Sequence, residues 1–310
     1  MPPTLRIYTS VGGIATTTDH KGATGMSMVQ KGRISGLLVG AVSLALGLSG
    51  CGASYDTTSP RSAREHAAAD AGQSTPAASK PNVLKEGDKS GKGNKGDNSD
   101  NGDDTGSVDC AIVKCVALTF DAGPSGNTPR LLKILKREHV HATFFMLGKN
   151  HIVKHPDLVR RIADEGHELA NHTWSHKILT KTDSDEVRSE ITRVQDAVAR
   201  LTGRTPLLMR PPQGRTDERV SKICRELGVA QVLWSVTAKD YQTTDSALIE
   251  KRVLDQTKRD GIILLHDIYK GTVPAVPGIL AKLKKDGYTV VTVSQLMAPA
   301  TPEPGKVYRP

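Results

Sequence analysis

Aromatic residues and long apolar runs are scarce in this chain, and both absences narrow the classes of protein that it can be. Only 4% of the 310 residues are aromatic, and 37% are hydrophobic. A single stretch, residues 34–48, is apolar enough to enter a bilayer, which excludes a protein with several membrane spans. No three- or seven-residue period runs through the sequence, which excludes collagen-like and coiled-coil chains.

Positive charge is in excess and is concentrated in the second part of the chain. The net charge is +9, and residues 108–310 carry 31 basic and 23 acidic side chains. Such an excess attracts anionic polymers and also keeps a protein soluble. We expect no nucleic-acid partner, because no recognition motif appears and because the N-terminal segment is typical of an exported protein.

The apolar stretch 34–48 has the features of a signal peptide. Lys31 and Arg33 precede it, it is too short to span a bilayer comfortably, and it ends in Ser49, Gly50 and Cys51. This ending resembles a bacterial lipobox, in which the cysteine receives lipid. The alternative, a short buried helix with a chance cysteine, does not explain why charge, apolar core and small residues come in this order.

A lipid on Cys51 would anchor the mature chain to the outer face of a membrane without spanning it. Residues 1–25 match no region of a signal peptide, whereas Met26 or Met28 would give a more ordinary start. We therefore interpret residues 1–51 as a signal peptide with a lipobox, preceded by an extension from a mis-assigned start codon.

Residues 52–107 have the composition of a tether. They are mostly Gly, Ser, Ala, Asp, Asn, Lys and Pro, with Val83 and Leu84 as the only branched aliphatic residues and Tyr55 as the only aromatic one. Such a segment cannot bury enough apolar surface to offset the entropy lost on folding. We expect a flexible, low-complexity tether over 52–107 and a flexible tail over 299–310.

Residues 108–298 alternate between strand and helix patterns. Apolar runs predict strands over 116–120, 142–147, 168–171, 207–210, 231–235, 262–266 and 289–293, and amphipathic spacing predicts helices over 128–138, 156–165, 183–202, 217–227, 245–257 and 273–286. Asp183 with Glu186 resembles a capping box, and Gly203 a helix stop. Seven strands alternating with helices indicate an α/β protein with a parallel sheet, either a (β/α) barrel or an open doubly wound sheet.

Three cysteines lie beyond the lipobox. Cys110 and Cys115 flank a short loop before the first strand, and an exported protein can keep a disulfide there. We predict that bridge. Cys224 lies in a predicted helix and is expected to be a buried, inert thiol.

Chemically active side chains follow the predicted strands. Asp121 ends the first strand, His172 and His176 follow the third, Arg210 ends the fourth, Asp240 follows the fifth, and His266 ends the sixth. Each has a structural explanation when taken singly, such as a turn residue, a loop anchor or a buried histidine. Their order along successive strands favours a functional site, because α/β enzymes work where parallel strands end.

At this point the chain resembles the polysaccharide deacetylase family, which includes chitin and chitooligosaccharide deacetylases. The resemblance covers roughly residues 115–297, and it extends to Thr143-Phe144-Phe145, Gly166-His167-Glu168 and Gly287-Tyr288. It implies a distorted (β/α) barrel with fewer than eight strands, here about seven. It also implies metal-assisted hydrolysis of an acetyl group on an N-acetylated sugar, or of an O-acetyl ester in some members.

The resemblance implies a role for each matching residue. Asp121 matches the general base, and Arg210 the residue that keeps this aspartate ionised. His172 and His176 match ligands of a divalent metal, zinc or alternatively cobalt, that activates water and stabilises charge. The remaining matches are His266 as the general acid, Asp240 as the carboxylate that orients it, the backbone N–H of Gln213 as an oxyanion donor, and Leu264 as the wall that receives the acetyl methyl group.

Three positions depart from the family pattern. The family usually has a second aspartate as third metal ligand where this chain has Ala122, an aromatic residue where it has Gln213, and a tryptophan where it has Tyr241. Two readings follow, a working enzyme with a modified site or a non-catalytic surface lipoprotein that binds glycan. We favour the enzyme, because Asp121, Arg210, Asp240 and His266 perform proton chemistry and are all retained.

The address and the fold class together suggest a substrate. A monomeric enzyme tethered by lipid outside the cell membrane meets cell-wall glycan first, so acetylated peptidoglycan or an exported polysaccharide is expected. Chitin oligomers and acetylated xylan are the alternatives.

Overall fold

The computed structural model describes residues 57–73 and 108–310. Cys51 and the predicted signal peptide lie outside the described residues, as do residues 74–107 of the predicted tether. Within the described ranges, no helix is both long and apolar enough to cross a membrane.

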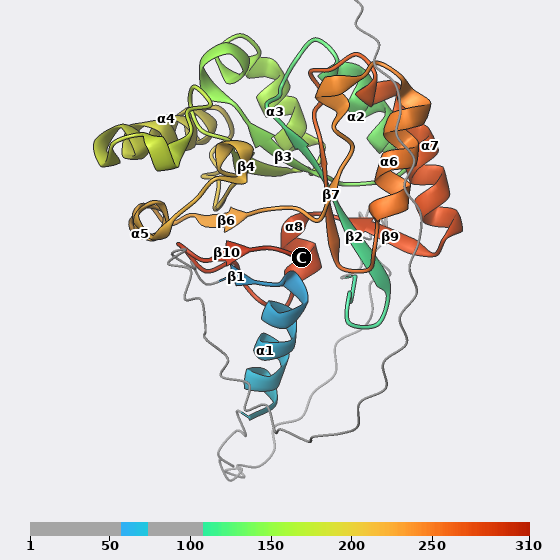
Figure 1. The fold of residues 1–310 in the computed structure, drawn as a ribbon, viewed down its shortest axis with the longest axis horizontal. Helices are drawn as coiled ribbons and strands as arrows, with labels where there is room; N and C mark the ends of the chain where they lie inside the picture. Colours follow the sequence, from blue (N-terminus) through green and yellow to red (C-terminus); the bar gives the residue numbers. More distant parts are fainter. Residues whose placement is uncertain (1–56, 74–107) are drawn as a thin grey trace, which may run out of the picture. The chain divides into compact units, whose positions relative to one another are not determined.

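The described residues form a parallel sheet that curves into a distorted (β/α) barrel, as the sequence predicts (Figure 1). The strands follow the order β1-β10-β6-β5-β4-β3-β2-β8-β7, and β9 pairs with β2. Their bounds are β1 (Thr57–Thr58), β2 (Lys114–Asp121), β3 (Thr143–Met146), β4 (Glu168–Asn171), β5 (Leu208–Met209), β6 (Ala230–Val232), β7 (Val236–Thr237), β8 (Gly261–Leu265), β9 (Tyr288–Val291) and β10 (Val307–Tyr308).

All seven expected strands are present, and β1, β7 and β10 extend the count. Each of the three additional strands has only two residues. A two-residue strand is too short to show alternation or an apolar run, so the sequence pattern does not predict it.

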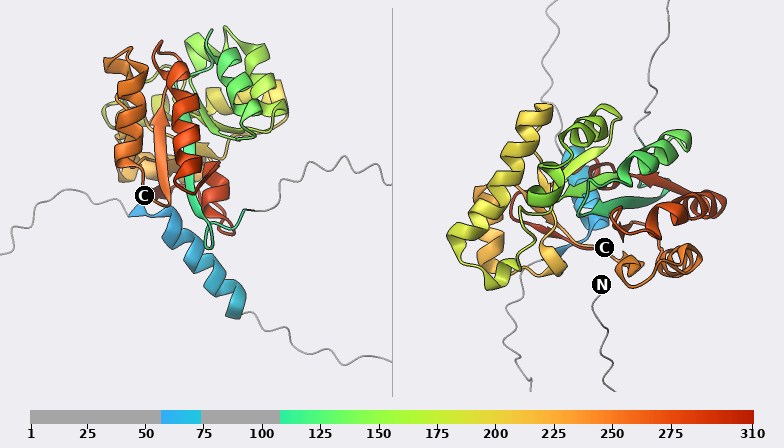
Figure 2. Two further views of the ribbon diagram at one scale, coloured as in Figure 1. Left: turned by 90° about the vertical axis from the view of Figure 1, so that its right-hand side faces the viewer. Right: turned by 90° about the horizontal axis from the view of Figure 1, so that it is seen from above.

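Helices cover the outside of the sheet. Along it, α6, α7, α2, α3, α4 and α5 follow one another, each in contact with the next, and Figure 2 shows α6 and α7 side by side in orange and red. The bounds are α1 (Pro60–Gln73), α2 (Thr128–Arg137), α3 (Pro156–Asp164), α4 (Ser184–Thr202), α5 (Glu218–Glu226), α6 (Ser246–Gln256), α7 (Thr272–Lys285) and α8 (Val293–Met297), with short helical turns η1 (Gly148–Ile152), η2 (Leu179–Lys181), η3 (Pro212–Gly214) and η4 (Asp240–Gln242).

The signals that predicted α4 are visible in its geometry. The side chain of Asp183 accepts a hydrogen bond from the backbone N–H of Glu186, which satisfies one free donor of the first turn. Gly203 ends the helix in a left-handed conformation at φ 70°. The apolar residues Val187, Ile191 and Val194 are fully buried, so the predicted face of the helix is the one that packs.

The cysteines lie as the sequence predicts. Cys110, which precedes β2, forms a disulfide with Cys115, the second residue of β2. Cys224 is buried in α5, and this burial raises the pKa of its thiol to about 12. A thiol held in its neutral form is a poor nucleophile, so Cys224 has the properties of an inert core residue.

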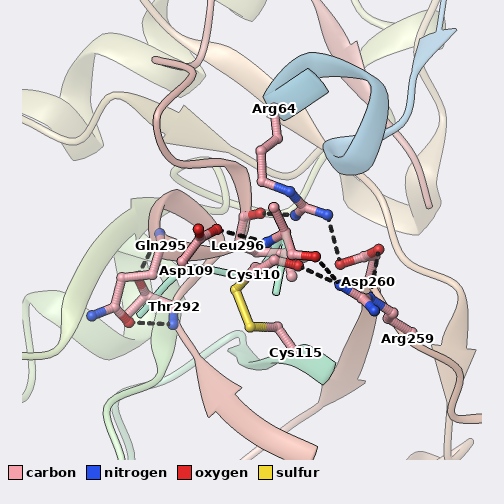
Figure 3. Close-up of a disulfide and its surroundings, with 10 residues drawn as sticks. Arg64, Asp109, Cys110, Cys115, Arg259, Asp260, Thr292, Gln295 and Leu296 are labelled. Carbon is pink, nitrogen blue, oxygen red and sulfur yellow. Dashed lines mark hydrogen bonds and ion pairs between the residues drawn. A yellow bond between two sulfur atoms is a disulfide. The ribbon is translucent and has the colours of Figure 1, made fainter. Parts of the chain in front are cut away.

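Helix α1 corrects the expectation of a flexible tether over residues 60–73. Ser59 accepts a hydrogen bond from the N–H of Ser62, and Pro60 occupies the first helical position, so the helix has a defined start. Its attachment is polar, because the buried Arg64 donates to the carbonyl of Leu296 at 2.7 Å and pairs with Asp260 at 3.1 Å (Figure 3). A helix that docks through an arginine has no periodic apolar face, so the sequence pattern does not predict it.

The predicted flexible tail over 299–310 is also corrected. Val307 and Tyr308 are 99% buried, and β10 lies between β1 and β6 in the sheet. These two apolar residues gain sheet hydrogen bonds and burial together, which outweighs the disorder-promoting prolines and glycine before them.

Replacing Arg64 tests how α1 is held. We expect Arg64→Ala to destabilise the docked helix by about 1.5–3 kcal/mol, because the buried hydrogen bonds to Asp260 and to the carbonyl of Leu296 are lost while Asp260 keeps Arg259 at 3.7 Å. Hydrogen exchange of the amides in α1 measures this. Arg61→Ala is the control, since the pair of Arg61 with Glu65 is exposed to solvent and contributes little to stability. Equal protection of α1 in both variants would contradict a polar attachment through Arg64.

Candidate active site

The site begins where four parallel strands end. Asp121 is the last residue of β2, and His172, Arg210 and His266 directly follow β4, β5 and β8. The carboxyl ends of parallel strands lie at one edge of a sheet, so side chains from distant parts of the sequence converge there.

Asp121 and Arg210 form a buried ion pair. Nη1 of Arg210 lies 2.7 Å from Oδ1 of Asp121, and only 2% of Asp121 and none of Arg210 is exposed. Arg210 also donates to Oγ1 of Thr119 at 2.8 Å and to the carbonyl of Val232 at 3.0 Å. Its guanidinium lies 4.0 Å from the centre of the Phe145 ring. The arginine is therefore fixed on several sides and presents one charged donor to the aspartate.

His172 is held as a neutral imidazole with one free nitrogen. Its Nδ1–H donates to the backbone carbonyl of Arg210 at 2.9 Å. Burial lowers the pKa of His172 to about 4, although Asp121 acts in the opposite direction. Nε2 is then unprotonated, and it lies 3.8 Å from Oδ2 of Asp121. A neutral histidine whose other nitrogen is fixed by a hydrogen bond is prepared to bind a metal.

His176 lies next to His172 on a strained loop. The two ring centres are 4.9 Å apart, and partial burial lowers the pKa of His176, which also favours its neutral form. His176 and Thr173 both adopt left-handed backbone conformations, at φ 64° and 70°. Such conformations persist only where the surroundings enforce them, so the surroundings fix the directions in which the side chains of this loop point.

Glu190 of α4 enforces that loop, and the sequence analysis missed it. It is 2% exposed, and its two carboxylate oxygens accept hydrogen bonds from the N–H of Ser175 at 2.7 Å and from the Ser175 hydroxyl at 2.5 Å. The available signal was positional, because Glu190 is a charged residue on the apolar face of α4, three residues after Val187 and directly before Ile191. A buried charge at such a position needs partners.

His266 and Asp240 form a second hydrogen-bonded pair of ionisable side chains. Nδ1 of the His266 ring lies 2.8 Å from Oδ1 of Asp240. Oδ2 of Asp240 accepts hydrogen bonds from the backbone N–H of His266 at 2.8 Å and from the Thr272 hydroxyl at 2.7 Å. Burial favours the neutral imidazole, but the hydrogen bond and charge of Asp240, with a further contribution from Asp121, outweigh it and raise the pKa of His266. The ring therefore keeps its proton to higher pH than an ordinary histidine.

The three residues expected to line the substrate site lie in three different environments. Tyr241 is 53% exposed, with its ring centre 6.3 Å from that of His266, so the two lie together. Leu264 is buried in β8, level with Thr119 of β2. Gln213 is exposed in η3 and has a left-handed φ of 58°.

Two aromatic residues near the site were not predicted. The ring centre of Tyr269 lies 5.3 Å from that of His266. Trp234 packs against Gly214, and its ring centre lies 5.7 Å from the Arg210 guanidinium. Tyr269 follows β8, and Trp234 lies between β6 and β7. Their positions close to strand ends were the signal available in the sequence. A cavity of about 590 Å³ lies elsewhere, lined by His139, His141 and His167, and contains none of the predicted site residues.

The donor set fits a divalent cation only in part. His172 and His176 offer two neutral imidazoles side by side, but Ala122 presents a methyl group where a third ligand is expected. Among the described residues, no group of three or more His, Cys, Asp or Glu side chains is arranged to hold a metal. Two imidazoles can bind zinc with water completing the coordination, though more weakly than three protein ligands.

Known proteins resemble this chain over the barrel. The family model for polysaccharide deacetylase matches residues 109–232. A peptidoglycan-N-acetylglucosamine deacetylase of Listeria monocytogenes is 41% identical over 184 residues, covering 59% of this chain and 39% of that protein. A peptidoglycan-N-acetylmuramic acid deacetylase of Bacillus subtilis is 35% identical over 190 residues, covering 59% of this chain and 72% of that protein.

A solved deacetylase structure with substrate is similar in both sequence and fold. It is 40% identical, has a TM-score of 0.62, and is matched over 99% of its own length by 65% of this chain. By contrast, this chain spans only about two fifths of the Listeria relative, so that protein has further regions without a counterpart in the matched segment.

Restoring a carboxylate at residue 122 tests the metal fit. Ala122 has a φ of 63°, a conformation that Asp and Asn adopt more readily than Ala. We expect Ala122→Asp to raise zinc affinity on the order of tenfold or more, because a third ligand joins the two imidazoles. Isothermal titration measures the affinity. Ala122→Asn is the matched control for backbone strain, and an equal gain in both variants would argue against coordination by residue 122.

Proposed function

The chain belongs to the polysaccharide deacetylase family, and we propose that its barrel hydrolyses acetyl groups from the N-acetylated sugars of a cell-wall glycan. Relatives named as deacetylases of peptidoglycan N-acetylglucosamine and of N-acetylmuramic acid support a peptidoglycan-like substrate. The single observation that carries the proposal is the presence of two separate proton-handling pairs, Asp121 with Arg210 and His266 with Asp240, at one edge of the sheet.

Asp121 is proposed as the general base. Arg210 occupies Oδ1, so Oδ2 is the oxygen that faces His172 and can accept a proton from an attacking water molecule. The ion pair also fixes the position of the carboxylate, because the arginine is itself held by Thr119 and Val232. Positioning a base in this way removes the need to order it during the reaction.

His266 is proposed as the general acid that protonates the leaving amine. Asp240 holds its Nδ1–H, which leaves Nε2 as the nitrogen available to donate a proton. The raised pKa of His266 keeps the ring protonated closer to neutral pH, as a general acid requires. Tyr241 and Tyr269, whose rings lie 6.3 Å and 5.3 Å from the His266 ring, would exclude water and contact the sugar.

His172 and His176 would hold the divalent metal, for which zinc is proposed and cobalt is the alternative. Such an ion supplies Lewis acidity toward the acetyl carbonyl and toward water. The chain's own contributions beside it are the backbone N–H of Gln213, proposed as an oxyanion donor, and Leu264, proposed to contact the acetyl methyl group.

The second candidate is a non-catalytic protein that binds glycan on the same fold. Ala122 is the observation that favours it, because the third metal ligand is absent. The enzyme is favoured over it because the two proton-handling pairs are complete and because the relatives that align with the chain are named as deacetylases. A binding surface alone has no use for a histidine whose pKa is raised by a buried aspartate.

We also propose that the protein acts as a monomer outside the cell, held to the membrane by lipid on Cys51. The order of basic residues, apolar core and small residues before Cys51 supports this address. The positive charge of residues 108–310 is suited to anionic wall polymers.

Acetate release decides between the two functions. Purified chain with added zinc or cobalt should release acetate from peptidoglycan fragments, measured by mass spectrometry. Asp121→Asn should lower the rate by about 10²–10⁴-fold, the usual contribution of a general base, while glycan binding persists. Asp157→Asn, at an exposed position, is the control. Binding without acetate release by the parent chain would favour the binding protein.

The pH dependence tests the role of Asp240. The raised pKa of His266 means that the acid form persists as pH rises, so kcat/KM should fall only above the ordinary histidine range. Asp240→Asn removes the charge and should move this alkaline limb to lower pH, with a lower maximum. Asp255→Asn, at an exposed helical position, should leave the limb in place. An unchanged limb in Asp240→Asn would show that His266 is not the acid.

A further inference from the structure

The loop closed by the disulfide Cys110–Cys115 exposes two apolar side chains. Ile112 is 78% exposed and Val113 is 38% exposed, although large apolar residues elsewhere in the described chain are mostly buried. The loop is held firmly, because Arg259 donates to the carbonyls of Cys110 at 2.9 Å and Ala111 at 2.7 Å. Because Ile112 and Val113 are adjacent on a fixed loop, they form a small apolar tip whose burial against another surface would be favourable.

This loop lies at the end of the barrel away from the catalytic residues. Asp260 precedes β8, and its backbone N–H donates to the carbonyl of Cys115 at 2.9 Å, whereas His266 follows β8. In β2, Cys115 is near the start and Asp121 is the last residue. The five residues of β8 therefore separate the loop from the active site by about 17 Å along the strand.

The N-terminal segment of the body joins it at this same end. Arg61, Arg64 and Ala68 of α1 line a small groove of about 170 Å³ together with Ala111 of the loop and Arg259 (Figure 3 shows Arg64 beside the disulfide). Thr57, where the described chain begins, is six positions after Cys51. Six residues span at most about 20 Å, so a lipid on Cys51 would hold the body within that distance of the membrane, and the surface of the body decides which end faces it.

Basic side chains surround the loop. Lys258 and Arg259 are exposed before β8, and Lys284 and Lys285 are exposed at the end of α7. Lys114 of β2 donates to the carbonyl of Asp286, which directly follows Lys285. The neighbouring acids have partners, since Glu65 pairs with Arg61, Asp286 pairs with Lys282, and the exposed Asp109 accepts the backbone N–H of Ala111 within the loop. A basic rim around an apolar tip is complementary to a bilayer surface that contains anionic lipid headgroups.

We propose that this end of the barrel, formed by residues 110–115 and their basic neighbours, rests on the anionic membrane surface, with Ile112 and Val113 entering the headgroup region. The proposal rests on the proposed lipid anchor at Cys51. The catalytic residues then face away from the membrane, toward the glycan.

The same geometry assigns different roles to the two parts of the predicted tether. Residues 52–56 alone connect Cys51 to the body and set its distance from the membrane. Residues 74–107 leave α1 and return to Val108, which packs against the core, so both ends of this connection are attached to the body. Its length does not change the distance between barrel and membrane.

Tryptophan substitutions test the orientation. The full chain, extracted from membranes and reconstituted on phosphatidylglycerol-containing vesicles with a doxyl-labelled lipid, would carry Ile112→Trp or, as the matched control, Val153→Trp. Val153 is 58% exposed and follows η1 beyond the catalytic end of β3. We expect a blue-shifted emission and a loss of fluorescence for Ile112→Trp, relative to the parent with Trp174 and Trp234, and neither change for Val153→Trp.

Each other outcome has a separate meaning. Anchored protein in which the two tryptophans are quenched equally, or in which neither is quenched, would overturn the orientation while leaving the anchor intact. Protein found only in the soluble fraction would overturn both the anchor and the orientation. Deacetylase activity on soluble glycan, measured on the same samples, reports separately on the proposed reaction.

Insertions provide a matched second test. Twenty Gly/Ser residues inserted between residues 54 and 55 should reduce the quenching of Ile112→Trp, because the lipid then no longer holds the loop at the surface. The same insertion between residues 90 and 91 should leave the quenching unchanged. Reduced quenching from the second insertion alone would contradict the assignment of residues 52–56 as the connection that sets the distance.

Discussion

The buried ion pair between Arg210 and Asp121 is the interaction around which the active site is organised. Arg210 is fully buried, so its charge must be compensated, and Asp121 is the carboxylate that does so. The backbone carbonyl of the same arginine fixes the tautomer of His172. One residue therefore positions the proposed base through its side chain and the proposed metal ligand His172 through its main chain, which links β2, β4 and β5 at their carboxyl ends.

Much of this arrangement could be predicted from the sequence, because strands and helices in the barrel have strong apolar periods. The strand 168–171 and the end of α4 at Thr202 agree with the structure to the residue, and Asp183 caps the start of α4. What escaped prediction has a common physical character. Helix α1 docks through Arg64, Glu190 is a buried charge with loop partners, and β10 is two residues long. Polar attachments and very short strands leave no periodic apolar signal.

Residue 122 shows why a local sequence difference has a limited structural effect. Its backbone is left-handed and its N–H donates to the carbonyl of Phe145, so the turn after β2 keeps its shape with alanine in place. Alanine adopts this conformation less readily than aspartate or asparagine does, at a cost of about 1–2 kcal/mol. The fold tolerates that cost, so the expected effect of alanine at this position is on the proposed metal site and not on the turn.

The attachment of α1 at the base of the barrel separates two properties that a single flexible tether would combine. Because residues 74–107 form a connection closed at both ends, doubling its length costs only about 0.6 kcal/mol in closure entropy. Under the proposed anchor at Cys51, this connection could accumulate insertions, deletions and repeats over evolutionary time without moving the active site relative to the membrane, whereas the few residues ahead of Thr57 could not.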